Sequence, residues 1–335
     1  MNTTVRDNSI DILRFIGLML IILSHASPSV DSIVQLRCFD VPMMLFISGL
    51  TCSNKEFPDY RVFIKRRTLR LIAPVYIFLT FYFIILAIVQ HLGIIPKYLT
   101  IGKVAESFLL LNGIGYVWII RVFLLIMLVT PLLCKVGKLS NSIVLITMVI
   151  LLSLCEIIVH ITNNPNIPNI ISIVLKEYII YILAYSVPFL LGYKLRYYNK
   201  HTYIFWAVAS SLALIIGIII YIYNLGLPIN ISPYFKYPPQ TYFIIYGVFS
   251  STIMWMTKEW WVKRIDFRLV QFIGQNTIWI YLWHIPFVLL CNQFIDNWYI
   301  RYILLICAPV LIFSVQYKLV QKINIIGQAK KFLIG

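Results

Sequence analysis

The sequence predicts an all-α membrane protein, a polytopic bundle of about ten transmembrane helices with both termini in the cytoplasm. Of its 335 residues 61% are hydrophobic and only 12% are charged, and the mean hydropathy is +0.87. Soluble domains carry about 25% charged residues. Apolar stretches long enough to cross a bilayer recur from end to end, and basic residues concentrate in alternate loops. Together these three observations predict the fold class.

Ten apolar segments approach the length of about 20 residues that a helix needs to cross the hydrocarbon core. They cover residues 10–27, 39–54, 71–91, 115–134, 142–160, 177–195, 203–223, 240–257, 271–292 and 299–318. The second is short and interrupted by glycine. Residues 103–112 are too few to cross, so we expect them at the interface or in a re-entrant turn. Asp11 and Arg14 within the first segment argue against a cleaved signal peptide.

The loops predict the orientation. Basic clusters occur at Lys55–Arg70, Lys135 and Lys138, Lys194–Lys200, Lys258–Arg268 and Lys318–Lys331. The intervening loops hold only scattered cations, among them Arg37, Lys97 and Lys236. Because short cytoplasmic loops are enriched in Lys and Arg, the clustered loops are predicted to be cytoplasmic. The net charge of +16 therefore reflects topology, and no motif accompanies it that would predict a nucleic-acid partner.

The chain is predicted to form a single transmembrane domain over residues 1–335, with no attached soluble domain. Its six cysteines show neither a C-x-x-C pair nor the spacing of metal ligands, so we predict no metal site. They are expected to fill space within apolar helices.

Arg14 and His25 lie eleven residues apart in the first apolar segment. On an ideal helix this spacing returns to within about 20° of the same face and rises about 16 Å. Ionisable groups inside a membrane are candidates for function. The alternative is that Arg14 extends to the headgroups and His25 marks the far interface. The predicted topology places Arg14 toward the cytoplasm and His25 near the outer face.

A second basic group, FIKRRTLRLIAPVY at 63–76, opens the third span. Arg67 and Arg70 are three residues apart, so both point from one side of the helix start. Guanidinium groups bind phosphates bidentately and can hold an anionic cofactor that arrives from the cytosol. An ordinary topology-setting cluster that binds lipid headgroups is the alternative.

Five stretches, in order, resemble the acyltransferase-3 family of integral membrane acyltransferases. They are IDILRFIGLMLIILSH (10–25) with its Arg-x10-His spacing, VPMMLFISGL (41–50), RRTLRLIAPVY (66–76), YVWIIRVFLLIMLVTPLL (116–133) and FIGQNTIWIYLWHIPFVLL (272–290). The last departs from the family's His-Pro pattern, because Ile285 separates His284 from Pro286.

The resemblance implies transfer of an acyl group, usually acetyl, from coenzyme A to a hydroxyl of a bacterial surface glycan or its lipid-linked precursor. It implies an enzyme that crosses the bacterial cytoplasmic (inner) membrane several times. His25 and Arg14 would be catalytic, with His25 as the general base, a role that suits a group titrating near neutral pH. Arg14, Arg67 and Arg70 would bind acetyl-CoA, and Asp11 can orient Arg14 by pairing with it.

Other polar residues in the spans are candidates for the acceptor site: Trp118, Arg121, Glu156 and His284. Glu156 and His160 are also spaced as an i, i+4 pair. Arg121 and Glu156 can equally be structural. The resemblance favours a functional role for His284 without defining it. Aromatic residues such as Trp118 can stack on a sugar or belong to an interfacial belt.

Two other functions are compatible with a polytopic membrane protein: a lipid-linked glycan flippase or transporter, and a glycan polymerase. A carrier built from repeats should show two halves with matching interrupted helices, and none is evident. A polymerase needs a long outer loop, and the outer loops here are short. Neither has an evident need for the arginine and histidine set.

Overall fold

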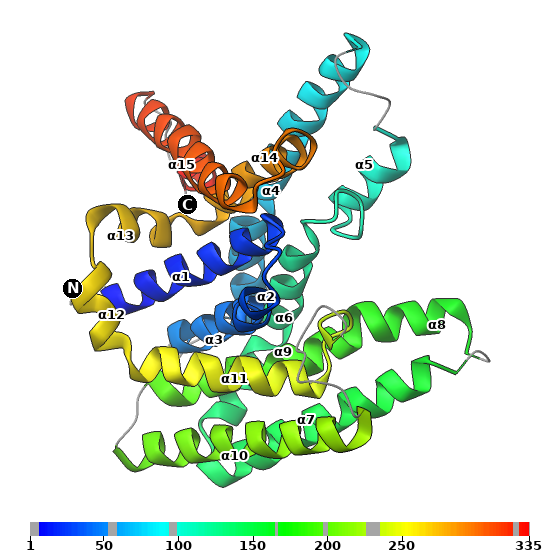
Figure 1. Cartoon of the computed structure of the whole chain (residues 1–335), viewed down its shortest axis with the longest axis vertical. Coiled ribbons are helices and arrows are strands. Elements are labelled where there is room, and N and C mark those ends of the chain that lie inside the picture. The colour runs from blue at the N-terminus through cyan, green and yellow to red at the C-terminus, as the bar shows by residue number, and fades with distance from the viewer. Residues whose placement is uncertain are drawn as a thin grey trace. The chain divides into compact units, whose positions relative to one another are not determined.

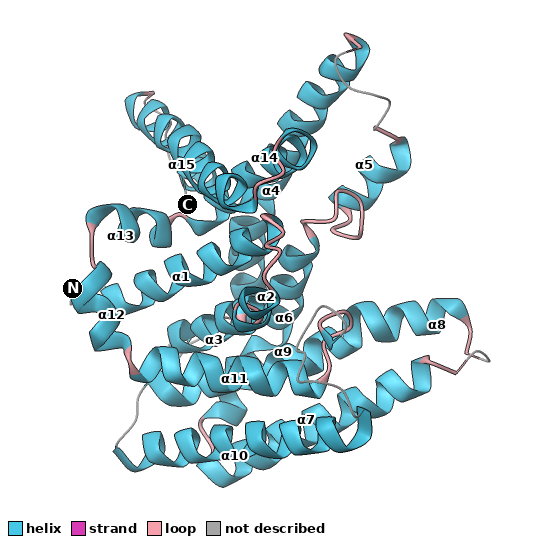
Figure 2. Cartoon of the chain, in the orientation of Figure 1, coloured by secondary structure: helices cyan, strands magenta, loops and turns pink. Residues whose placement is uncertain are grey.

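The computed structural model describes residues 7–52, 59–93, 99–164, 167–196, 200–225, 235–323 and 328–334. Figure 2 shows helices joined by loops and no strand among these residues. The helices are α1 (Asn8–His25), α2 (Asp31–Leu36), α3 (Asp40–Cys52), α4 (Tyr60–His91), α5 (Ile101–Phe108), α6 (Trp118–Gly137), α7 (Asn141–Thr162), α8 (Asn169–Val174), the π-helix η1 (Leu175–Ile179), α9 (Ile180–Arg196), α10 (Lys200–Leu225), α11 (Thr241–Met256), α12 (Lys258–Ile265), α13 (Arg268–Gln275), α14 (Thr277–Phe294), α15 (Trp298–Lys322) and α16 (Gln328–Ile334) (Figure 1).

The all-α polytopic class is confirmed. Within the described residues, nine helices or helix pairs are long and apolar enough to cross a membrane, and α11 is a shorter apolar helix. These ten correspond one to one with the ten predicted spans. The segment expected not to cross forms α5, which has only 8 residues. Lys55 and Lys97, which contributed to the predicted orientation, lie outside the described residues.

Three helix boundaries differ from those expected. The helix of the third span begins at Tyr60, because Asp59 caps it by accepting a hydrogen bond from the backbone N–H of Arg61 at 2.7 Å. The basic residues from Arg61 to Arg70 are therefore helical. The predicted ninth span is broken at Asn276 into α13 and α14, so the spanning helix starts at Thr277. The sixth extends back to Asn169 through the π-helical turn η1.

The chain divides into two compact units, each built from segments that are distant in sequence. Unit 1 comprises Met1–Ser24, Pro28–Phe57 and Leu128–Gly274, and unit 2 comprises His25–Ser27, Pro58–Met127 and Gln275–Gly335. In unit 1, α9 packs against α3, α7 and α11, and α10 packs against α11 (Figure 1). In unit 2, α14 packs against α4 and α15, and α16 packs against α4 and α15. A single transmembrane domain stays a prediction.

In unit 1, the backbones of α3 and α9 approach each other closely at two glycines. A Cβ atom added to Gly49 of α3 would lie 2.0 Å from the Phe189 carbonyl oxygen, and one added to Gly192 of α9 would lie 1.9 Å from that of Phe46. Each glycine thus allows the backbone of the other helix to come into direct contact, as small residues do between membrane helices. Gly49 belongs to the Ser-Gly pair that ends the VPMMLFISGL stretch.

An ion pair joins the start of α1 to the end of α9 in unit 1. The Arg196 guanidinium donates to the Asp7 carboxylate at 2.5 Å, and the Ser9 backbone N–H donates to the same carboxylate at 3.0 Å. Burial by itself raises the pKa of Asp7. The hydrogen bonds from Arg196 and Ser9 outweigh burial, and the pKa falls below its ordinary value of 3.8.

Asp7→Asn is therefore expected to destabilise the protein at pH 7 by about 1 kcal/mol. A lowered folded-state pKa stabilises the fold above the unfolded value of about 3.9, and this stabilisation is lost as the pH falls through the folded value. Thermal unfolding in detergent should show a lower midpoint for Asp7→Asn at pH 7 and a difference that closes below about pH 4. The control is Asp31→Asn, which removes an exposed carboxylate. If the difference in unfolding midpoint between the wild type and Asp7→Asn did not change with pH, the lowered pKa of Asp7 would be contradicted.

Candidate functional site

Arg14 and His25 lie on one continuous helix, α1, as predicted. The Arg14 guanidinium bonds to the Asp11 carboxylate at 3.1 Å. Asp11 is buried, at 1% exposure, whereas the Arg14 side chain is 30% exposed. A buried carboxylate thus holds the guanidinium of a partly exposed arginine. The predicted pairing of Asp11 with Arg14 is confirmed.

His25 is the last residue of α1, and its imidazole meets that of His284 within unit 2. Nδ1 of His25 lies 2.8 Å from Nε2 of His284. The ring centroids are 4.9 Å apart and the ring planes are 15° from parallel. His284 belongs to α14 and is fully buried. The structure therefore brings together two histidines that are separated by 259 positions in the sequence.

The hydrogen bonds determine the tautomers of the two neutral rings. Nδ1 of His284 contacts the backbone carbonyl oxygen of Tyr281. A carbonyl only accepts hydrogen bonds, so this nitrogen carries the proton and Nε2 of His284 carries the lone pair. Nδ1–H of His25 then donates to Nε2 of His284, which leaves the lone pair of His25 on its Nε2. The two successive hydrogen bonds, from His284 to the Tyr281 carbonyl and from His25 to His284, thus orient the basic Nε2 of His25.

Two tyrosines complete the surroundings of the histidine pair. The Tyr116 ring meets His25 edge-on, with centroids 4.9 Å apart. The Tyr281 hydroxyl donates to the Tyr116 carbonyl oxygen at 2.5 Å. Tyr281 and His284 are three residues apart on α14, so one helical face contacts both His25 and the chain at Tyr116. The sequence-based reasoning missed both tyrosines, although each stands in a stretch that resembles the family.

Trp118 and Arg121 occupy the first turn of α6, directly after Tyr116 in unit 2. Arg121 is buried, at 5% exposure, and Trp118 is half-buried. Their role in acceptor binding stays a prediction. The indole N–H groups of two tryptophans on α14 make hydrogen bonds within unit 2. Trp279 donates to the Phe332 carbonyl oxygen at 3.0 Å, and Trp283 donates to the Gln316 side-chain oxygen at 2.7 Å.

Arg67 and Arg70 lie in the N-terminal part of α4. Arg70 is exposed, and Arg67 is half-buried, with its guanidinium 5.7 Å from the centre of the Phe63 ring. The i, i+3 spacing on this helix places both on one side, as expected. Lys65 and Arg66 are exposed neighbours. The arrangement offers guanidinium groups to an anion in solution.

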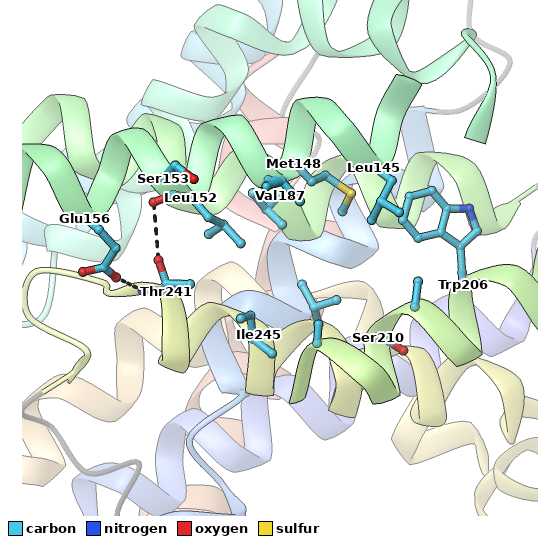
Figure 3. Close-up of a pocket in the computed structure, with 14 residues that line it drawn as sticks. Leu145, Met148, Leu152, Ser153, Glu156, Val187, Trp206, Ser210, Thr241 and Ile245 are labelled. Atoms are coloured by element: carbon cyan, nitrogen blue, oxygen red, sulfur yellow. Dashed lines mark hydrogen bonds between the residues drawn. The ribbon is translucent and has the colours of Figure 1, made fainter. Parts of the chain in front are cut away.

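Glu156 borders an apolar cavity in unit 1 of about 260 Å³, lined by residues of α7, α9, α10 and α11. Its carboxylate accepts a hydrogen bond at 2.7 Å from the backbone N–H of Thr241, the first residue of α11. Figure 3 shows Glu156 and Thr241 at one end of the cavity and Trp206 at the other. Glu156 thus caps a helix and, among the described residues, makes no ion pair with His160. A role for Glu156 in substrate binding stays a prediction.

Among the described residues, no group of three or more His, Cys, Asp or Glu side chains could hold a metal ion.

Comparison with known families identifies the chain. The family model described as an acyltransferase domain, acyltransferase-3, matches residues 7–317. No curated protein and no solved structure matches the chain. The family match includes α1 with Arg14 and His25, α4 with the arginine pair, and α14 with His284. Because it spans nearly all of the 335 residues, the chain belongs to the acyltransferase-3 family and is a membrane acyltransferase.

Proposed function

We propose that the protein is an O-acetyltransferase of the bacterial cytoplasmic membrane. It moves an acetyl group from cytosolic acetyl-CoA to a hydroxyl of a surface glycan or of its lipid-linked precursor. The observation that carries this proposal is the oriented His25 imidazole at the end of α1, in a chain of the acyltransferase-3 family. An acyl acceptor hydroxyl needs a base, and His25 supplies one on Nε2.

In the proposed reaction, Nε2 of His25 takes the proton of the acceptor hydroxyl. The acceptor oxygen forms a bond to the thioester carbonyl carbon, and the carbon–sulfur bond breaks. Coenzyme A leaves as the thiolate and receives the proton from the His25 imidazolium. A general base of this kind typically contributes about 100- to 10,000-fold to the rate. A route through an acyl-enzyme needs the same base for its second step.

His284 acts as a positioning residue in this proposal. Its Nε2 holds Nδ1–H of His25, so the basic nitrogen of His25 faces away from the pair. The lone pair on His284 also stabilises the His25 imidazolium that forms during the reaction, since Nδ1–H becomes a stronger donor when the ring is charged. The arrangement resembles the use of a hydrogen-bond acceptor to orient a catalytic histidine in other acyl-transfer enzymes.

Arg14, Arg67 and Arg70 are the proposed partners of the anionic part of acetyl-CoA. Coenzyme A carries its phosphates at one end of a long arm and the thioester at the other. Guanidinium groups suit phosphates because they offer a planar set of donors. Arg70 is exposed, and Arg14 and Arg67 are partly exposed, which supports this proposal.

Arg67→Ala combined with Arg70→Ala is expected to weaken acetyl-CoA binding by at least about tenfold, because each charged hydrogen bond contributes on the order of 1.5–3 kcal/mol. Calorimetry or fluorescence titration on the purified protein measures this change. The matched control, Lys65→Ala with Arg66→Ala, removes the same charge from the same turn of α4. If both double variants lost the same affinity for acetyl-CoA, the basic cluster would act only through its net charge and not through specific contacts of Arg67 and Arg70.

The function itself is tested by expressing the chain in a bacterium that makes a defined surface glycan without O-acetyl groups. NMR of the purified glycan should show new O-acetyl signals with the wild-type chain and none with an empty vector. A flippase or polymerase would instead change the amount or the chain length of the glycan and leave its acylation unchanged. That result would overturn the proposal.

A further inference from the structure

A buried group of charges lies at the junction of α2 and α3 in unit 1. It consists of Arg37, which follows α2, Asp40, which begins α3, and Lys236, which precedes α11. All three are buried, at 8%, 1% and 5% exposure. By sequence, Arg37 and Lys236 belong to loops predicted to face the outer side. We call these three residues the Asp40 cluster.

The carboxylate of Asp40 is saturated by its neighbours. It accepts from the Arg37 guanidinium at 3.0 Å and from the Lys236 ammonium at 3.0 and 3.1 Å. The Val41 backbone N–H donates to it at 2.7 Å. Two cations therefore share one anion, and the Asp40 cluster carries an excess positive charge. An uncompensated buried charge is costly, so the excess calls for a further anion.

Two hydrogen-bond donors beside the Asp40 cluster have no partner among the described residues. They are Nε–H of Arg37 and the hydroxyl of Tyr185. Tyr185 is fully buried and lies on α9, the helix that packs against α3, which Asp40 begins. Buried donors are nearly always satisfied, so each exception indicates a missing acceptor. The excess charge favours an anion, and an anionic oxygen would also accept from the two donors.

The Asp40 cluster lies directly beneath the protein surface. Leu36, the residue before Arg37, is 67% exposed, and Tyr237, the residue after Lys236, is 50% exposed. The chain thus passes from an exposed position to the buried Arg37, and from the buried Lys236 to an exposed position, within one residue. Arg37 and Asp40 also follow His25 closely in the chain, in the segment predicted to lie on the outer side, where the proposed acceptor is presented.

From these observations we infer that the Asp40 cluster, with Tyr185, is a binding site for a carboxylate or phosphate group of an acidic acceptor glycan. The inference deepens the proposed function and rests on it for the identity of the acceptor. Arg37 and Lys236 supply the positive charge, and Nε–H of Arg37 and the Tyr185 hydroxyl donate to the anionic oxygens. Asp40 holds the two cations in place. The site selects acidic sugars or sugar phosphates over neutral sugars.

The test measures binding without acyl transfer. The full chain, purified in detergent in chloride-free buffer at pH 7, is titrated with methyl β-glucuronide, glycerol 1-phosphate or the neutral methyl β-glucoside, and thermal unfolding is followed. We expect the unfolding midpoint to rise with at least one of the anions and to stay constant with the glucoside. The anion that acts distinguishes a carboxylate ligand from a phosphate ligand.

Tyr185→Phe is the decisive variant, because it removes only one hydroxyl. Without ligand it should unfold at the wild-type midpoint or above it, since it deletes an unsatisfied buried group. With the anion, its affinity should fall by about tenfold. Arg37→Lys, which keeps the charge and removes Nε–H, should show the same fall. Ser251→Ala is the matched control, because the Ser251 hydroxyl on α11 is also buried without a partner among the described residues.

Equal stabilisation by the glucoside, or an anion response that Tyr185→Phe and Arg37→Lys both retain, would overturn the inference. So would a full response to chloride alone with none to the glucuronide or the phosphate, because the occupant would then be an inorganic ion. Anion binding in a chain that adds no O-acetyl group would overturn the proposed function and leave the anion site intact.

Discussion

Replacing His25 with alanine is expected to lower acyl transfer by roughly 100- to 10,000-fold, the range that a general base contributes. The variant should still bind acetyl-CoA with wild-type affinity, because the proposed phosphate partners are arginines elsewhere. O-acetyl incorporation into the glycan, measured by NMR at matched protein levels, reports the rate. His160→Ala, which removes an exposed histidine of α7, is the control and should retain full activity.

His284 should be coupled to His25 in the same assay. His284→Leu removes the acceptor for Nδ1–H of His25 and should lower transfer by about 100-fold. His284→Gln, whose amide oxygen can accept that hydrogen bond, should recover part of the loss. Because the two imidazoles act as a unit, the variant lacking both should be no slower than His25→Ala alone. Additive losses, or no recovery with glutamine, would show that His284 acts only through packing.

Asp40→Ala is expected to produce the largest loss of stability in the chain, about 3–5 kcal/mol. The substitution leaves Arg37 and Lys236 buried without the carboxylate that both contact at 3.0 Å. Chemical or thermal unfolding in detergent should show the loss, and the amount of protein in the membrane should fall. Asp31→Asn, which removes an exposed carboxylate of α2, provides a baseline near the wild-type value.

A triple variant, Arg37→Met, Asp40→Leu and Lys236→Met, separates charge from packing at the Asp40 cluster. Replacing a buried ionic group by apolar residues of similar size is often neutral or stabilising, whereas removal of one partner is not. The triple variant should therefore be much more stable than Asp40→Ala. If Asp40→Ala unfolded at the wild-type midpoint, the Asp40 cluster would not be electrostatically coupled.

The helices were predictable from the sequence because each depends on local composition. Hydropathy identified all ten apolar segments, and the i, i+3 spacing of Asp11 and Arg14 predicted their contact. Helix boundaries were less predictable: hydropathy marks where a helix becomes apolar, whereas α4 begins eleven residues earlier at the cap formed by Asp59. The break at Asn276 had a local signal, because Gly274, Gln275 and Asn276 interrupt the apolar run, but a hydropathy window averages over three residues.

The contacts that form the candidate sites were not predictable, because they join distant parts of the chain. His25 and His284 are 259 positions apart, and Asp40 and Lys236 are 196 apart. A single sequence carries no signal for such pairs. Arg37 and Lys236 were interpreted as scattered loop cations. The contact of Lys236 with Asp40 joins distant segments, whereas the i, i+3 spacing of Arg37 and Asp40 was a local signal that the loop charge count did not use. The family resemblance indicated His25 and His284 separately, without their contact.

The reciprocal glycine contact between α3 and α9 affects how damaging variants in this enzyme should be interpreted. The stretch that ends in Ser48 and Gly49 resembles a family signature, and such signatures are readily taken as catalytic. Here the glycine is explained by the carbonyl oxygen that faces it, 2.0 Å from where a Cβ would stand. A genetic screen that scores only loss of acyl transfer would count substitutions at Gly49 or Gly192 together with those at His25. Measuring the amount of folded protein in parallel separates defects of assembly from defects of chemistry.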